Sequence, residues 1–459
     1  MNKCFFILCL VALLSGCYRD SKEISSFINS KERLPQNWWH VYGGILLDDL
    51  VQELMYQNWD VQKAYSKIKE AKGNLRLEKS VSFFHLNGIA SANRTNKEMG
   101  VPRPISIHEG GFETNWEISL FKGNYHNWKG AWCYLNSVLA DKEDVINTVI
   151  TFLVNYCISY KQDYQKIKEL NDLILLYDTH IDILEARLRA QYISEDELLV
   201  IKGYQNQAKQ EKILAEARLR NTQYAMEELL GADRSEALNQ FMLDHQPLSI
   251  PLLYSMDDVP LHIIKNRPDV KGAFWHLLAS KEYVKAKEQD FWPNITLKTF
   301  FGWQKGDKEL LLVSPMWSLA SSLGVPLFNF GQLKASLQIA DAQSEEAFYS
   351  YEKTVITALK EAQTALNDYA SSYKNYQEEK ENLSLIESKL ALENERYLAG
   401  LIDQIPLQEV SIQKQRIVLH LVDREAEIRQ AYLRWQKALG CSLLTSSYPK
   451  SLEKIISYS

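Results

Sequence analysis

The chain has 459 residues, a formal net charge of −6 and 46% hydrophobic residues, a composition that excludes a largely disordered protein. The chain has 52 basic and 58 acidic residues, and the basic residues are not clustered. Both observations argue against a nucleic-acid partner. With only 12 Pro and 19 Gly, the chain is expected to form long uninterrupted elements.

The N-terminus has the pattern of a targeting segment. Lys3 precedes an apolar run from Cys4 to Leu14, which is too short to span a bilayer but suits the core of a signal peptide. The LSGC that ends at Cys17 resembles a bacterial lipobox, in which the Cys becomes the lipidated first residue. We therefore expect a lipoprotein signal peptide over residues 1–16 and acyl chains such as palmitate on Cys17, with a simple secretory signal as the alternative. Tyr18, rather than Asp, implies sorting to the outer membrane.

Matching segments recur along the chain at an almost constant offset. Asp60-Val61 corresponds to Asp269-Val270, 209 positions later, and the tetrapeptide TVIT begins at Thr148 and again at Thr354, 206 positions later. Tyr192 corresponds in the same way to Tyr397, at 205. Short solenoid repeats have periods of roughly 20–50 residues, so this period indicates two copies of a whole folding unit. The predicted organisation is a lipidated linker (17–45), a first repeat (46–231), an inter-repeat linker (232–255), a second repeat (256–441) and a C-terminal tail (442–459).

Each repeat is predicted to contain a helix, two strands and two long helices. In the first repeat the predicted elements are a helix over Leu46–Ser80, a weak strand over Phe84–Arg94, a strand in FETNWEISLF (112–121), a helix over Asn127–Tyr192 and a returning helix over Glu195–Leu230. In the second they are a helix over Leu261–Asp290, strands in NITLKTFFGW (294–303) and WSLASSLGV (317–325), a long heptad-patterned helix through Phe348–Leu390 and a returning helix over Asp403–Leu439. At 1.5 Å per residue, the helix that ends at Tyr192 would be about 100 Å long.

The strands alternate apolar and polar residues. In the second of them Phe112, Thr114, Trp116, Ile118 and Leu120 share one face. Such alternation is typical of a half-buried strand in any protein, and also of an outer-membrane strand with its apolar face toward lipid. Four strands cannot close a barrel, and an open edge in lipid leaves backbone groups unpaired. A membrane location therefore requires several chains to share one barrel.

Three cysteines remain after the predicted signal peptide and Cys17, namely Cys133, Cys157 and Cys441. This odd number fits no disulfide framework. Cys133 and Cys157 fall at helix positions and are interpreted as buried packing residues.

Several short segments, taken in order, resemble the TolC-like outer membrane factors, and in particular the lipoprotein branch of efflux partners related to OprM. The resemblance covers the chain from Cys17 to Gly440. The matching segments are Trp38-Trp39, WEISLF before a Gly, RPDV at Arg267–Val270, FWPNITL at Phe291–Leu297, PLFNFG at Pro326–Gly331, ERYLAGLID at Glu395–Asp403 and KALG at Lys437–Gly440.

The resemblance implies a mainly α fold with membrane β strands. Three copies of the duplicated helix–strand–strand–helix–helix unit would share a 12-stranded β-barrel, continued by a long α-helical barrel. It implies an outer membrane exit duct for small molecules in a tripartite efflux system, anchored in outer membrane lipid with the helical part in the periplasm. The implied partners are an inner-membrane transporter of the RND type and a periplasmic adaptor, or membrane fusion, protein. It also implies that the TVIT copies occupy equivalent positions on the two long helices.

The two helix tips are expected to dock the adaptor, because they lie farthest from the strands and have the least regular sequence. Tyr192, Ser194, Tyr397, Gly400 and Leu401 flank these turns. Gly400 is expected to take a positive φ and end its helix, which by itself is an alternative reason for a Gly there. The first tip, AQYISEDEL, has no such Gly.

Two acids after the second tip are candidates for the closed aperture. Asp403 can alternatively cap the returning helix, and Glu409 can alternatively lie on a solvated face. The family often follows this acid with an Arg, but Ile412 stands at the Arg position here. At the entry to the first strand, Phe84 stands where the second repeat has Pro293.

No motif indicates an enzyme, a cofactor or a metal site. The sequence has no HExxH, CxxC, GxSxG or phosphate-binding Gly loop, so the only expected attached group is the lipid on Cys17. Two other functions remain open at this stage. One is a duct for type I protein secretion, and the other is a non-conducting structural lipoprotein of the cell envelope, against which the alternating strands count.

Overall fold

The computed structural model describes residues 38–95, 105–119, 121–231, 235–244, 246–250, 264–305 and 314–441. The predicted signal peptide, Cys17, the tail after Cys441 and Leu120 lie outside these residues. The chain divides into two units, and the fold described below is that of the unit from Trp39 to Leu443.

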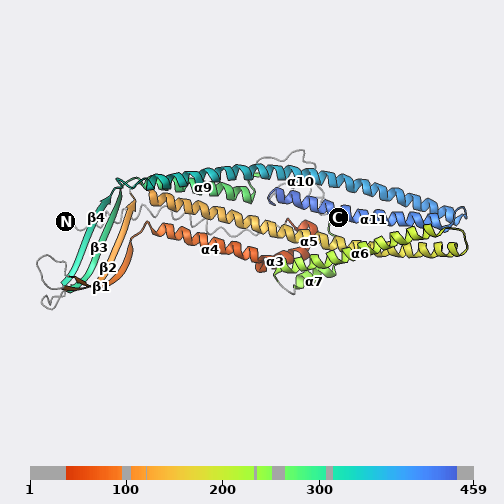
Figure 1. Cartoon of the computed structure of the whole chain (residues 1–459), viewed down its shortest axis with the longest axis horizontal. Coiled ribbons are helices and arrows are strands. Elements are labelled where there is room, and N and C mark those ends of the chain that lie inside the picture. The colour runs from red at the N-terminus through yellow and green to blue at the C-terminus, as the bar shows by residue number, and fades with distance from the viewer. Residues whose placement is uncertain are drawn as a thin grey trace, which may run out of the picture. The chain divides into compact units, whose positions relative to one another are not determined.

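Twelve described elements make up the two repeats and their connection (Figure 1). The first repeat consists of α3 (His40–Gln57), α4 (Trp59–Ser80), β1 (His85–Thr95), β2 (Ile105–Ser119), α5 (Gly123–Arg189) and α6 (Glu195–Leu230). After α7 (Glu236–Leu243), the second repeat consists of α9 (Pro268–Gln289), β3 (Asn294–Lys305), β4 (Ser314–Gly324), α10 (Gln332–Leu398) and α11 (Gln404–Ala438). The predicted order of helices and strands is confirmed.

The predicted single helix over Leu46–Ser80 is wrong, because the chain breaks at Asn58. This residue has an extended backbone (φ −63°, ψ 127°), and its Oδ1 accepts hydrogen bonds from the backbone N–H groups of Asp60 (2.9 Å) and Val61 (3.1 Å). Asn is a preferred N-cap because its side chain satisfies N–H groups that have no partner inside the helix. The structure also places the start of α3 and all of α7 in the segments predicted as linkers, 17–45 and 232–255.

The duplication is confirmed, and its offset is constant at 209 residues. The helices α4 and α9 both have 22 residues, and α5 and α10 both have 67. Backbone landmarks recur at the same spacing: the N-caps Asn58 and Arg267, the left-handed residues Lys122 and Gly331, Gln191 and Gly400, and Gly231 and Gly440. The positive φ predicted for Gly400 is confirmed at 73°.

Two predicted correspondences between the repeats are wrong in register. With Lys122 and Gly331 as fixed points, Thr148 corresponds to Thr357, so the two TVIT copies are displaced by about one helical turn. Tyr192 corresponds to Leu401 rather than to Tyr397, because each donates its backbone N–H to the residue five positions earlier at the end of its helix. The alignment of identical short segments gave the wrong register, because similar residues recur at neighbouring turns of a helix.

The same corner is built in both repeats with different side chains. Asn58 donates from Nδ2 to the carbonyl of Leu229 (2.8 Å), near the end of α6. Its counterpart Arg267 donates from Nη1 to the carbonyl of Ala438 (2.8 Å), at the equivalent position in α11. These bonds satisfy carbonyl groups that have no partner at the helix end, and they fix the first helix of each repeat against the last.

The four strands form one antiparallel sheet in the order β1-β2-β3-β4. In its register Phe112 pairs with Phe301, which pairs with Trp317. Directly paired residues lie on the same face of a sheet, so the predicted apolar residues of neighbouring strands share one face. The opposite face carries polar side chains such as Glu117 and Asn294, which are hydrogen bonded to each other at 3.0 Å.

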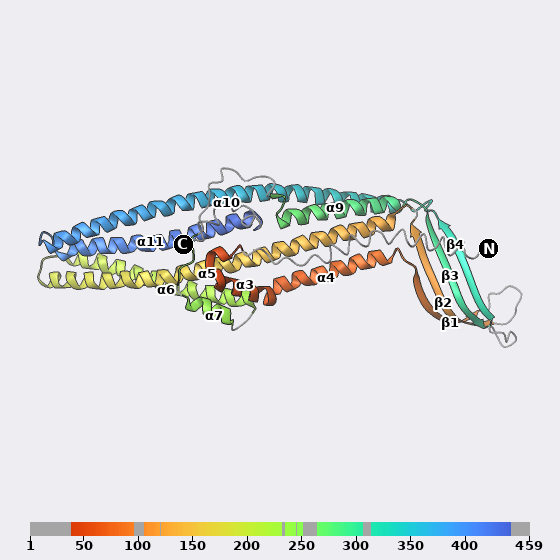
Figure 2. The same cartoon turned by 180° about the vertical axis from the view of Figure 1, so that it is seen from behind.

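The long helices form a layer in which α5 is central. Near the strands α5 lies between α4 and α9, and α9 in turn contacts α10. Toward the tips α5 contacts α6 and α11, and α11 contacts α10 (Figures 1 and 2). The layer therefore has two edges, one formed by α4 and α6 and the other by α10, just as the sheet ends in β1 on one side and β4 on the other.

Cys133 and Cys157 are buried within α5, as predicted. Burial raises the pKa of the Cys133 thiol above its usual range. Both residues therefore act as small apolar packing groups.

Candidate functional site: the helix tips and the seam between the repeats

No constellation for chemistry was found in the parts of the chain that the structure describes. Within those parts no group of His, Cys, Asp and Glu is arranged to hold a metal ion. None of the helices found there is both long and apolar enough to cross a lipid bilayer. The features that remain are the two helix tips and the polar contacts between the repeats.

The predicted tip residues lie at the two turns that join α5 to α6 and α10 to α11. Tyr192 and Leu401, which correspond in the repeat, are 82% and 75% exposed. Ser194 is also exposed and is the N-cap of α6, whereas Tyr397 lies in the last turn of α10. The first tip makes its turn without glycine, because Gln191 takes the left-handed conformation (φ 63°) that Gly400 takes in the second.

Asp403 fulfils the capping role and also joins the two tips. Its Oδ1 accepts a hydrogen bond from the backbone N–H of Ile405 (2.9 Å), and its Oδ2 accepts one from Nη2 of Arg187 (2.5 Å) at the end of α5. The Arg187 guanidinium, with the Ile405 N–H, lowers the pKa of the Asp403 carboxyl. The carboxylate is half exposed, so solvent screening keeps this pair's contribution to stability small.

Glu409 is exposed on α11 between buried Gln408 and Val410. His180 of α5 is buried, and its Nδ1 has no hydrogen-bond partner among the described residues. Burial lowers the pKa of His180, and the charge of Glu409 acts in the opposite direction. Asp403 and Glu409 are therefore both on α11 near the tip, but they have different surroundings.

Ile412, at the position where an Arg was expected, is buried in an apolar cluster with Leu170 and Leu419. An arginine is provided one turn later. Arg416 donates from Nη2 to the hydroxyl of Tyr177 (2.6 Å), and its guanidinium lies 4.9 Å from the ring centre of Tyr204. This residue links α11 to both α5 and α6.

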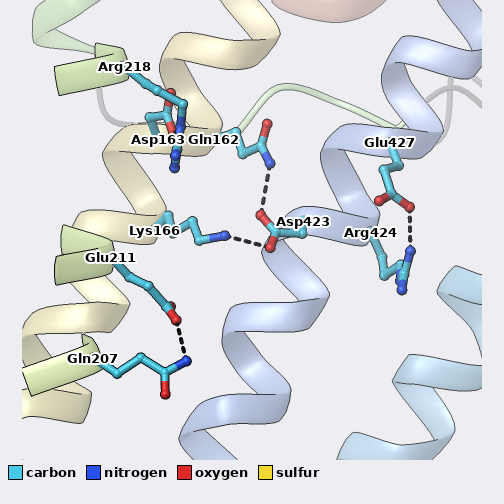
Figure 3. Close-up of polar contacts among 9 residues, drawn as sticks. All are labelled: Gln162, Asp163, Lys166, Gln207, Glu211, Arg218, Asp423, Arg424 and Glu427. Carbon is cyan, nitrogen blue, oxygen red and sulfur yellow. Dashed lines mark hydrogen bonds and ion pairs between the residues drawn. The ribbon is translucent and has the colours of Figure 1, made fainter. Parts of the chain in front are cut away.

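Farther from the tips the same seam is joined by charged and amide side chains (Figure 3). Asp423 of α11 accepts hydrogen bonds from Nε2 of Gln162 (2.9 Å) and Nζ of Lys166 (2.6 Å), both on α5. Beside them Nε of Arg218 on α6 lies 3.1 Å from Asp163, whose pKa is raised by burial although the Arg218 charge opposes this. These residues line a polar recess of about 410 Å³.

Sequence reasoning missed Arg187, Arg416 and the Lys166–Asp423 pair. Each joins residues of the two repeats that lie more than 200 positions apart. The internal repeat could have predicted that the two repeats contact each other, because a duplicated helix pair must pack against its copy. It could not have predicted which residues pair, because that depends on the side-by-side order of the helices.

The polar links are concentrated where α5 meets α11. Arg187–Asp403, Gln408 to the carbonyl of Leu176 (2.8 Å) and Gln415–Glu169 (2.8 Å) follow one another along this seam. Such contacts depend on geometry and exclude less water than apolar packing. The same seam also contains the apolar cluster of Leu170, Ile412 and Leu419, so both polar and apolar contacts join α5 to α11.

Comparison with known proteins agrees with this architecture. The family profile "Outer membrane efflux protein" matches residues 259–441, which make up the second repeat. The chain is 26% identical over 407 residues to the solvent efflux pump outer membrane protein SrpC of Pseudomonas putida, covering 85% of this chain and 84% of the relative. It is 21% identical over 426 residues to the pyoverdine export outer membrane protein OpmQ of Pseudomonas aeruginosa, covering 88% of this chain and 87% of the relative.

The fold is also shared with a solved structure. The outer-membrane channel OprN superposes with a TM-score of 0.78 at 20% identity, over 90% of this chain and 93% of that one. The two repeats, the four-stranded sheet and the paired long helices thus have a close structural counterpart. Residues 259–441 therefore match the outer membrane efflux protein profile, and the chain is similar over most of its length to outer membrane proteins of efflux pumps.

Proposed function

We propose that the chain is an outer membrane channel, the exit duct of a tripartite efflux system that passes small molecules from the periplasm to the outside. The observation that carries this proposal is the two-sided sheet continued by an open layer of long helices. The sheet has one apolar and one polar face, as a strand between lipid and water requires. The similarity to proteins named for solvent efflux and pyoverdine export supports the same role.

The open edges support a homotrimer. An unpaired strand edge in lipid leaves backbone groups without partners at a cost of several kcal/mol each, and β1 and β4 are such edges here. Each edge strand of the sheet is connected to an edge helix of the layer, because α4 leads into β1 and β4 leads into α10. Three copies arranged head to tail would close a 12-stranded barrel and, below it, a helical barrel.

The tips are the proposed contact for the periplasmic adaptor, which would connect the duct to an inner-membrane transporter. Tyr192 and Leu401 support this role, because large apolar side chains so exposed at a turn favour a protein contact. Asp403 and Glu409 would then lie near the aperture, where three-fold symmetry brings three copies of each side chain together.

The proposed anchor is lipid on Cys17. Cys17→Ser should abolish incorporation of labelled palmitate and leave the signal peptide uncleaved, because the thiol is the only acceptor at the lipobox. Labelling, together with mass spectrometry of the N-terminus, measures both effects, and wild type is the control. Normal processing of the variant would contradict the lipoprotein assignment. The lipid aids insertion rather than conduction, so partial transport is expected to persist.

Recording in planar bilayers tests the duct and the aperture together. The purified wild-type protein should give discrete channel currents, whereas a non-conducting envelope lipoprotein should give none. Glu409→Ala should raise the single-channel conductance and weaken its block by divalent cations, because three carboxylates near the axis bind such cations. Glu427→Ala, which removes an exposed acid from the same helix far from the tip, is the matched control. Equal conductance and block in wild type and Glu409→Ala would remove Glu409 from the aperture.

Transport itself is tested by growth. Deletion of the gene should increase sensitivity to some members of a panel of solvents and antimicrobials, and complementation should reverse it. If the deletion instead abolished secretion of a protein and left sensitivity unchanged, the duct would serve protein secretion rather than efflux.

A further inference from the structure

A band of exposed apolar side chains lies along the connections between the sheet and the helices. These connections join α4 to β1, β2 to α5, α9 to β3 and β4 to α10 (Figure 1). Aromatic belts lie at the headgroup level in membrane proteins, and apolar surface this exposed is normally covered. The side chains of the band are 40–92% exposed, and they include Phe84, Phe121, Trp292, Leu327, Phe328 and Phe330.

Basic residues gather beside this apolar band. The segments 70–84, 121–133, 279–293 and 325–342 hold the connections and the adjoining helix ends, and they have nine basic and six acidic residues. The whole chain has 52 basic and 58 acidic residues, so the balance of charge is reversed here. Three of the nine form ion pairs with Glu282 or Asp290. The other six are exposed and have no ion pair with a described residue, and they are Lys72, Arg76, Lys79, Lys122, Lys281 and Lys334.

Three of the six exposed cations form a stripe on α4. Lys72, Arg76 and Lys79 are spaced by four and three residues, so they share one face of the helix. At 1.5 Å per residue, all three lie within about 12 Å of the helix end at Ser80. The helix dipole favours a basic residue in the last turn, where Lys79 lies. It does not account for Lys72 and Arg76, which lie farther back.

The lysines at the starts of α5 and α10 are placed against local preference. The positive end of a helix dipole favours acidic residues in the first turn, and neither of these helices has one there. Lys122, the N-cap of α5, also takes a left-handed φ of 66°, whereas Gly331 stands at the equivalent position of the second repeat. A residue with a Cβ adopts this conformation less readily than glycine. Neither feature stabilises the helix, which indicates that the positive charge meets a partner outside the chain.

We propose that the sheet–helix junction, defined as this apolar band and the six exposed cations, binds the headgroups of anionic phospholipids in the leaflet that faces the periplasm. The proposal rests on the outer membrane location proposed above and adds the class of lipid. Basic side chains beside a membrane attract anionic lipids, and the attraction falls off within a Debye length of about 8–10 Å. Lys and Arg donate charge-assisted hydrogen bonds to phosphate oxygens.

The arrangement of the cations fits a lipid surface. They come from all four helices that meet the sheet, and each lies within about 12 Å of the helix end that faces the sheet. They therefore form a row at one level beside the apolar band, instead of a patch on one helix. A layer of headgroups contacts such a row along its whole length, while the apolar band reaches the hydrocarbon.

Retention of lipid by the purified full-length protein tests this inference. The protein is mixed with detergent micelles that contain equal amounts of phosphatidylglycerol and phosphatidylcholine and is then re-isolated by size exclusion. Mass spectrometry measures the amount of each lipid per chain. Wild type should retain roughly fivefold more phosphatidylglycerol than phosphatidylcholine. The ratio should fall as NaCl is raised from about 0.05 to about 0.5 M, because the Debye length shortens.

A stripe variant, in which the three cations of the α4 stripe are changed to Gln, should lower this lipid ratio roughly threefold and leave phosphatidylcholine unchanged. The matched control is Lys63→Gln/Lys67→Gln/Lys69→Gln. It removes three exposed charges from the same helix, at an average of about 20 Å from its end, and should keep the wild-type ratio. Lys122→Gly should lower the ratio without loss of stability, because glycine takes the left-handed turn readily.

Equal retention of the two lipids by wild type, or the same ratio in the stripe variant and its control, would overturn the proposal. Channel currents in planar bilayers are recorded from the same preparations. If wild type conducts but shows no preference for phosphatidylglycerol, the lipid inference fails and the duct stands. If wild type shows the preference but gives no current, the duct fails and the junction is the lipid contact of a non-conducting protein.

Discussion

Arg267→Ala should lower the free energy of unfolding by about 3 kcal/mol, the largest loss expected from a single side chain away from the apolar core. Its guanidinium is buried and donates to Asp269 (2.7 and 3.0 Å), to Glu361 (2.7 Å) and to the carbonyl of Ala438 (2.8 Å). It therefore joins α9, α10 and α11 at one corner. Truncation leaves two carboxylates and a helix-end carbonyl without their donor.

The counterpart in the first repeat is the matched comparison. Asn58→Ala removes an N-cap and one bond to Leu229, and the expected loss is about 1–2 kcal/mol. Arg267→Lys keeps the charge but cannot reproduce the forked contact with Asp269, so it should lie between wild type and Arg267→Ala. The apparent melting temperature of the detergent-purified protein measures the order. A smaller fall for Arg267→Ala than for Asn58→Ala would show that the charged corner is not the stronger one.

Leu401→Asp should reduce efflux to the level of the deletion strain while the protein still folds and assembles. Leu401 lies at the second tip with most of its surface in solvent, so the change buries no charge and removes no packing. A carboxylate there would have to be desolvated in a contact with the adaptor, at a cost that an apolar side chain does not have. Tyr192→Asp, at the equivalent position of the first tip, should act in the same direction.

Leu243→Asp is the control for this effect, because Leu243 is also 75% exposed but lies at the end of α7, away from the tips. The measurements are growth with efflux substrates, the mass of the assembly, and crosslinking to the adaptor. Full efflux and unchanged crosslinking in Leu401→Asp would remove this residue from the adaptor contact. A loss of assembly would show instead that the tip contributes to folding.

The amino-acid pattern determines much of this fold by itself. Alternating residues from Phe112 to Ile118 predict the strand and its apolar face, because side-chain direction in a strand has a period of two residues. Heptad spacing predicts two long helices, although their observed bounds, Gly123–Arg189 and Gln332–Leu398, differ from the predicted 127–192 and 348–390. The returning helix Glu195–Leu230 is predicted to the residue. The duplication is also visible, since two copies of one unit need the same apolar positions.

Only the tertiary structure decides the features that depend on contacts between distant parts of the chain. The break at Asn58 exists because its side chain both caps α4 and holds Leu229, 171 residues away. Gln191 adopts the left-handed backbone conformation, which is uncommon for a residue other than glycine and so could not be predicted from the sequence. The free-energy cost of this conformation is offset by the packing of the helices on both sides of the turn. The role of Asp403 likewise depends on its contact with Arg187, which lies 216 positions earlier in the chain. Local periodicity determines which residues face the interior. The partner that each of these residues contacts depends on the side-by-side order of the helices, which is a property of the whole packed layer.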